Sequence, residues 1–192
     1  MNNRFEKFKN ITNKARKIVE EKKDLKKDIE RVAVEAIEAK SAKMICLVAY
    51  NFAEELDEKI ICKMAETLIE IGEAENIYSF ATQVKNAPIK KLAEGIIATK
   101  DADYIEMFAR IKGAPIDILA DAIIELRNAQ AIYSFALNVK GAPKKKMAKA
   151  ILKVGKEEDW EAYALDIMHT SVVDLIIDYA EIKRDKEQIE ME

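Results

Sequence analysis

The sequence predicts an all-α protein: a right-handed α-solenoid of about five helix-turn-helix repeats with an N-terminal capping helix. Glycine (5) and proline (3) are scarce among 192 residues, of which 49% are hydrophobic and 35% charged. Such a composition is typical of nearly continuous helix. The three prolines, at 88, 115 and 143, lie 27 and 28 residues apart, and a similar block precedes each. Self-similarity at a fixed period indicates a repeat architecture, so we expect residues 1–192 to form a single domain.

Residues 1–41 are expected to form the capping helix or helices. Apolar residues recur at alternating steps of three and four from Phe8 to Ala39, interrupted only by Lys22. Such a stripe fits either a helix that covers the first repeat or one arm of a coiled-coil homodimer. We favour the cap, because several positions of the stripe are alanine and one is lysine. The homodimer through this helix remains the alternative.

Five helical hairpins are assigned to residues 42–182, followed by a charged tail at 183–192. Two of the three central repeats share the block I-Y-S-F-A, and the repeat between them has I-E-M-F-A at 105–109. Shifting the apolar positions of the outer two by 28 residues finds apolar residues in the flanking repeats as well. These are Phe52, Leu56, Met64, Leu68, Tyr163, Ile167 and Leu175. The flanking repeats lose the K-x-A-P joint, as end repeats usually do.

The joint between the two helices of a repeat has a physical explanation. Asn86, Gly113 and Gly141 occupy the position at which the chain has to turn through a left-handed conformation, which glycine and asparagine tolerate best. The proline two residues later is expected at the first position of the next helix, where a missing N–H is harmless.

The pattern I-Y-S-F-A-x-x-V-K-x-A-P resembles helical repeats of uncharacterised clostridial and phage proteins, over residues 75–156. The resemblance implies an α-solenoid of the broad HEAT and tetratricopeptide kind. It implies no functional residues.

Candidate binding residues are lysines that recur along the repeats and two tyrosines at one repeat position. They are Lys85, Lys112, Lys140, Lys144, Lys145, Lys149, Lys153, Tyr78 and Tyr133. The first three follow the first helix of a repeat, where they complement the helix dipole or form a ladder for a phosphate backbone. Each tyrosine either buries its ring between hairpins or anchors a partner.

The fourth repeat has seven lysines and no acid between Lys140 and Lys156. This run either binds phosphate groups or is paired with acids of the neighbouring repeats. The repeat register places Asp117, Asp121 and Glu125 opposite Lys145, Lys149 and Lys153, so we expect ion pairs between them. Charge also alternates along the chain, and residues 157–192 carry twelve acids and three bases. Alternating charge of this kind favours a protein partner with a complementary pattern.

Catalysis is not expected. His169 is the only histidine, and Cys46 and Cys62 lie in apolar surroundings that predict buried, inert thiols. The sequence has no glycine-rich phosphate loop, zinc spacing or nucleophile elbow, so we predict no cofactor and no metal.

The first nine residues and the apolar runs bear on localisation. Residues 1–9 lack the apolar core of a signal peptide, and no apolar run approaches the ~18 residues of a membrane span. We therefore predict a cytoplasmic protein with no membrane partner. The predicted function is a non-enzymatic helical-repeat scaffold that binds a partner protein through a charge-striped surface. Nucleic-acid binding through the lysine stripes is the alternative.

Overall fold

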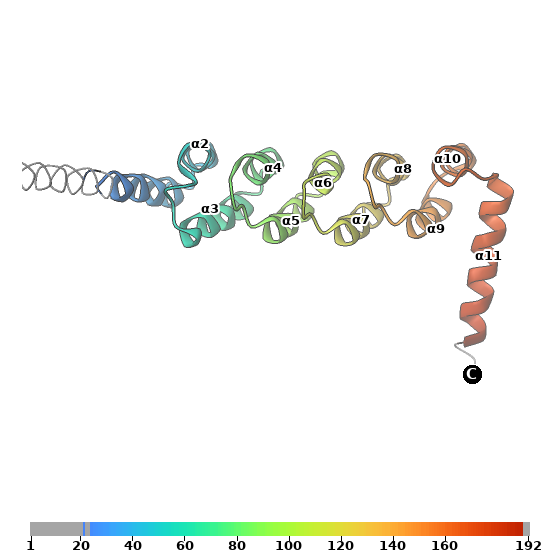
Figure 1. Cartoon of the computed structure of the whole chain (residues 1–192). Coiled ribbons are helices and arrows are strands. Elements are labelled where there is room, and N and C mark those ends of the chain that lie inside the picture. Colours follow the sequence, from blue (N-terminus) through green and yellow to red (C-terminus); the bar gives the residue numbers. More distant parts are fainter. Residues whose placement is uncertain (1–20, 22–23, 190–192) are drawn as a thin grey trace, which may run out of the picture. The chain divides into compact units, whose positions relative to one another are not determined.

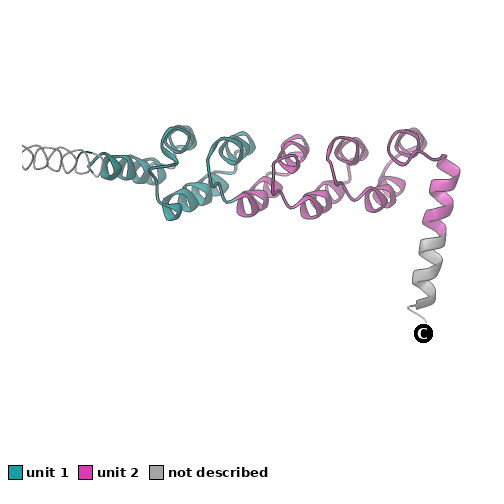
Figure 2. Ribbon diagram, in the orientation of Figure 1, with its two compact units in different colours: residues 1–88 teal, residues 89–192 magenta. Residues whose placement is uncertain are grey.

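The computed structural model describes residues 21 and 24–189, with side chains up to residue 180. Within this part of the chain every regular element is a helix, which confirms the all-α fold (Figure 1). None of the helices in the described ranges is both long enough and apolar enough to cross a membrane. The chain divides into two compact units, residues 1–88 and 89–192, which are described separately (Figure 2).

The first unit contains a helix over residues 24–38 and three further helices. These are α2 (Ala42–Phe52), α3 (Glu58–Ile71) and α4 (Ala74–Gln83), and each packs against the other two. The Ser41 hydroxyl caps α2 by accepting a hydrogen bond from the Met44 N–H at 3.4 Å. At the C-terminal end of α3, Gly72 turns the chain at φ 76°, and its N–H donates a hydrogen bond to the Leu68 carbonyl.

The apolar face of helix 24–38 differs from the predicted stripe. Of the stripe, Ile29 and Ala36 are buried, whereas Val32 and Ala39 are exposed. Ala33, which is buried, does not belong to the stripe. An α-helix has 3.6 residues per turn, so a face packed against straight neighbours drifts away from a strict heptad. The part of the stripe before residue 24 lies outside the described residues.

The second unit consists of α-helices that each pack against the next along the chain, and of a short π-helix, η1. They are α5 (Ile89–Ala98), α6 (Ala102–Ala109), α7 (Ile116–Glu125), α8 (Ala129–Asn138), α9 (Lys144–Val154), α10 (Glu157–Tyr163), η1 (Ala164–Met168) and α11 (Val172–Ile189). α6 packs beside α8 and α8 beside α10, while α7 packs against both α5 and α9. The helices from α5 to α10 therefore form two layers, and α11 lies outside these layers (Figure 1).

Residues at equivalent positions of the sequence repeat form the core of this unit. Phe108, Phe135 and Tyr163, from α6, α8 and α10, are fully buried. The other layer contains α7 and α9. Leu119 of α7 is equivalent to Met147 of α9, and Ile123 is equivalent to Ile151; all four side chains are 0% exposed. Burial of each such side chain contributes roughly 1.5–3 kcal/mol, so each helix is stabilised chiefly by its neighbours.

The turns after the first helices have the predicted backbone. Asn86, Gly113 and Gly141 have φ values of 62°, 86° and 87°, in the left-handed region that glycine and asparagine adopt at least cost. The prolines, however, lie one residue earlier than expected. Pro143 precedes the first helical residue of α9 with ψ 72°, and its carbonyl accepts a hydrogen bond from the Met147 N–H. Its carbonyl thus begins the helical ladder although its own backbone is not helical.

Candidate binding surface

Lys85 lies in the first unit, two residues after the end of α4. Its Nζ lies 2.8 Å from Oε1 of Glu54, and both side chains are exposed. This hydrogen bond and the accompanying Coulomb attraction raise the pKa of Lys85 and lower that of Glu54. The two residues border a surface hollow at the turn between α2 and α3. It is lined by Ala53, Glu54, Leu56, Glu58, Ile61, Lys85 and Asn86.

Lys112 and Lys140 occupy the equivalent turns of the second unit, after α6 and α8. Both are exposed, and neither forms an ion pair with any side chain that the structure describes. The three lysines of the predicted ladder therefore differ. Lys85 has a carboxylate partner of its own, whereas Lys112 and Lys140 do not have one among the described side chains.

The lysines of α9 form a basic ridge, which we define as Lys145, Lys149 and Lys153. These residues lie four apart, on the side of α9 opposite the buried Met147 and Ile151. Within the described part of the chain, neither these three nor Lys144 at the start of the helix forms an ion pair. The positive charge of the ridge is thus directed to solvent.

The expected pairing of α9 with α7 is wrong in register. Asp121 pairs with Lys146, not with Lys149, and the other expected pairs of α7 with α9 are not formed. Packed helix axes lie ~8–10 Å apart, so side chains at equivalent outward positions point the same way rather than toward each other. Lys146 lies on the flank of α9 and reaches across to α7.

An acidic ridge on α7 lies next to the basic ridge. It consists of Asp117, Asp121 and Glu125, which share the outward side of α7 at steps of four. Ile118, on the same helix, is 58% exposed. Because α7 packs directly against α9, the second unit presents a negative and a positive stripe side by side, with an apolar side chain beside the negative one.

The tyrosine position of the repeat connects neighbouring helices. Tyr133 on α8 is half-buried, and its hydroxyl donates a hydrogen bond of 2.6 Å to Oδ2 of Asp166 in η1. This hydrogen bond raises the pKa of Tyr133. Tyr78, at the same position of α4, is also half-buried. The hydroxyl of Tyr133 is thus already used within the protein, in a contact between α8 and η1.

Glu106 occupies the tyrosine position in α6 and has a polar network of its own. Its Oε1 accepts hydrogen bonds from the Arg110 guanidinium and, at 3.1 Å, from Nδ2 of Asn138 on α8. The Glu106 side chain is only 12% exposed. The sequence alone did not predict this network. Its one signal there is that Glu106 replaces the tyrosine found at this repeat position in α4 and α8.

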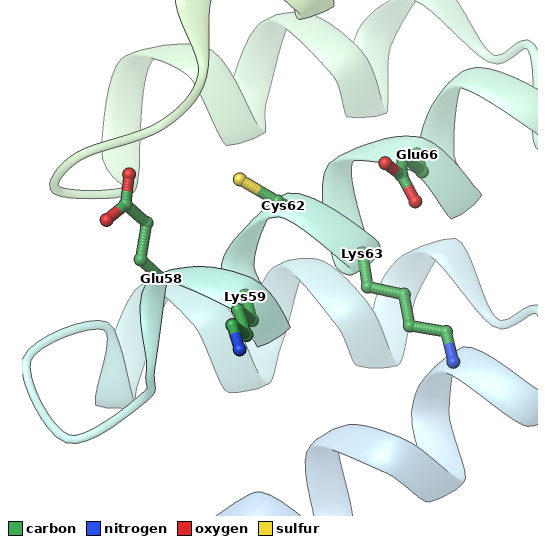
Figure 3. A pocket seen from close by; sticks show the side chains of 5 residues that line it. All are labelled: Glu58, Lys59, Cys62, Lys63 and Glu66. Atoms are coloured by element: carbon green, nitrogen blue, oxygen red, sulfur yellow. The ribbon is translucent and has the colours of Figure 1, made fainter.

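The two thiols are less buried than the sequence predicts. Cys46 and Cys62 are both half-buried, because each lies at the edge of the helix face that packs in the core and not at its centre. Burial and the nearby carboxylate of Glu73 raise the pKa of the Cys46 thiol. Cys62 lies in a shallow groove along α3, lined by Glu58, Lys59, Cys62, Lys63 and Glu66 (Figure 3).

Figure 3 shows the side chains of this groove spread along the helix rather than converging on one point. Among the described residues, no three His, Cys, Asp or Glu side chains gather closely enough to hold a metal ion. His169, the C-cap of η1, is exposed in a left-handed turn at φ 54°.

Comparison of the chain with protein-family models, with curated proteins and with solved structures gave no match.

Proposed function

We propose that this protein is a non-enzymatic scaffold that binds a partner protein through the acidic ridge of α7 and the basic ridge of α9. The observation that carries the proposal is the direct packing of α7 against α9 with their charged sides outward. A partner with one basic and one acidic stripe at the same spacing would pair with both ridges. Its orientation would then be specified, because a reversed partner would place like charges together.

The architecture that we propose is a right-handed α-solenoid of about five repeats with the N-terminal helix as a cap. Two features of the second unit support it: equivalent repeat positions are buried, and the helices form two layers. In such arrays each repeat contacts chiefly its neighbours, and the outward side chains of successive repeats form an extended surface for binding. The cytoplasmic location remains a prediction from the sequence.

Protein is favoured over nucleic acid because of the acidic ridge. A phosphate backbone bound along Lys145, Lys149 and Lys153 would pass close to Asp117 and Glu125 of the adjacent helix. Repulsion there would offset part of the attraction, and salt would weaken the remainder. Exposed Ile118 adds an apolar contact that suits a protein surface. Nucleic acid remains the second candidate, because the lysines of the basic ridge have no ion-pair partner in the described structure.

Charge reversal distinguishes the two candidates. The full chain would be used to capture partners from a cell lysate, with and without nuclease and at two salt concentrations. Lys149→Glu with Lys153→Glu should abolish capture of either kind of partner. Asp117→Lys should also abolish capture of a protein partner, but it should strengthen capture of nucleic acid. Lys43→Glu, an exposed change on α2, is the matched control and should leave capture unchanged. Capture of nucleic acid alone, strengthened by Asp117→Lys, would reject the proposed function.

A further inference from the structure

The last helix, α11, is attached to the second unit by a small part of its surface. It packs against α9 and η1, and of its described residues only Leu175 is buried. Helices in proteins are stabilised mainly by packing of an apolar face against the rest of the fold. α11 has such a face, but no helix in the described part of the chain covers it.

The uncovered face is a continuous apolar stripe. Val173, Ile176 and Ile177 are 60%, 41% and 47% exposed, and half-buried Ala180 follows at the next turn. Positions i, i+3, i+4 and i+7 lie on one side of a helix, so these four residues form one docking stripe. Leu175 lies on the other side of α11, so contact with α9 and η1 leaves this stripe exposed.

The charge around the stripe is negative. Asp174 and Asp178 are exposed on the same helix, and residues 157–192 carry twelve acids and three bases, a net charge of −9. Two copies of α11 would therefore repel each other if they paired through this stripe. A suitable occupant has apolar residues at helical spacing and an excess of positive charge.

One segment of the chain itself has this composition. Residues 1–19 carry six basic residues and one acid, a net charge of +5. Their apolar residues recur at steps of three and four, at Phe8, Ile11, Ala15 and Ile18. This spacing matches the alternation of three and four along the stripe of α11.

From these observations we infer that the chain self-associates head to tail, with the basic N-terminal segment of one copy docked on the apolar stripe of α11 of another. The choice of a second copy rests on the proposed solenoid, in which each repeat contacts chiefly its neighbours along the chain. A contact between two different surfaces leaves one of each free, so the assembly grows into rings or filaments rather than stopping at a dimer. Opposite charges on the two surfaces make the association weaker at high salt.

The test uses four forms of the 192-residue chain and measures mass in solution over a range of concentrations. The unmodified chain should form species larger than a dimer as concentration rises. Ile177→Lys, which inactivates the stripe, and Ile11→Glu, which inactivates the segment, should each be monomeric alone. Mixed together they should form a dimer and nothing larger, because only one functional contact then remains. Leu165→Lys, at an exposed apolar residue of η1 (69% exposed), should associate as the unmodified chain does.

Three outcomes would overturn this inference. The first is an unmodified chain that stays monomeric at every concentration. The second is association of Ile11→Glu alone, which would indicate pairing of α11 with α11. The third is association of Ile177→Lys alone, which would indicate pairing of N-terminal segments. Far-ultraviolet circular dichroism of each variant shows that the helices are retained. Because α7 and α9 are unchanged in these variants, a negative result would reject the head-to-tail association without rejecting the proposed function, which the capture experiment tests separately.

Discussion

Glu106 on α6 and Asn138 on α8 are joined by a hydrogen bond of 3.1 Å, although they are 32 residues apart in the chain. This separation exceeds the repeat period of 27–28 residues, because the hydrogen bond runs from the middle of α6 to the last turn of α8. Tyr133 and Asp166 form the same kind of contact one repeat later, at a separation of 33. Polar bonds of this type connect neighbouring helices of one layer and help to set how they align.

Replacing Glu106 should destabilise the second unit. Glu106→Ala removes an acceptor shared by Arg110 and Asn138, although Asn138 keeps its hydrogen bond to Ser134. The substitution should lower the free energy of unfolding by about 1.5 kcal/mol, the lower end for hydrogen bonds to charged groups, because Arg110 is half exposed. Urea unfolding measures the change. Glu94→Ala, at an exposed position of α5, is the control and should change stability by less than about 0.5 kcal/mol. Equal effects of the two variants would show that the network does not contribute.

Tyr163 should make the protein sensitive to alkaline pH. Its side chain is fully buried, and its hydroxyl donates a hydrogen bond of 2.8 Å to the Lys144 carbonyl. Burial raises the pKa of Tyr163 above the ordinary tyrosine value. Above about pH 10 the unfolded chain therefore loses this proton while the native chain keeps it, and stability falls by up to ~1.4 kcal/mol per pH unit from this residue.

The measurement is the urea midpoint of the unmodified chain and of Tyr163→Phe at pH 8, 10 and 11. The variant should be less stable at pH 8, because the hydrogen bond to Lys144 is lost. Its midpoint should nevertheless fall less between pH 10 and 11 than that of the unmodified chain. Parallel curves for the two proteins would contradict the assignment of the pH dependence to Tyr163.

Substitution of Gly113 should show the cost of placing a residue with a Cβ at the positive φ of these turns. The φ of 86° at Gly113 is disfavoured for residues with a Cβ, although an added Cβ would meet no atom within 4 Å. The cost of Gly113→Ala is therefore conformational, about 1–2 kcal/mol. Gly113→Asn should cost less, because asparagine occupies the equivalent turn at Asn86 with φ 62°. Thermal unfolding of the two variants would rank them, and an equal loss for both would contradict a conformational origin of the cost.

The pairing of Lys85 with Glu54 should slow its reaction with amine reagents. The raised pKa of Lys85 reduces the fraction of neutral, reactive amine at pH 9, so Glu54→Gln should increase its rate of acetylation. Peptide mass spectrometry measures the rate at each lysine, and Lys140 in the same sample is the internal control. If the rate at Lys85 does not change in the variant, the ion pair is not maintained in solution.

Much of the local structure follows from sequence, because it depends on residues close together in the chain. Asn86, Gly113 and Gly141 mark the turns by their tolerance of positive φ, and the periodic apolar residues identify Phe108, Phe135 and Tyr163 as core. Helical periodicity also placed Lys145, Lys149 and Lys153 on one side of α9. These features are properties of single helices and turns, and they recur with the repeat.

Contacts between helices could not be obtained in this way. The sequence register paired Asp121 with Lys149, whereas the structure pairs it with Lys146. The partners of Glu106 and Tyr133 lie 32 and 33 residues away rather than 28. A 28-residue repeat gives equivalent positions, but which side chains touch depends on the spacing, tilt and rotation of packed helices. The sequence by itself therefore determined the helices, their apolar faces and their turns. Only the tertiary structure decided which charges are paired and which face solvent, because side-chain contact requires atoms within a few ångströms.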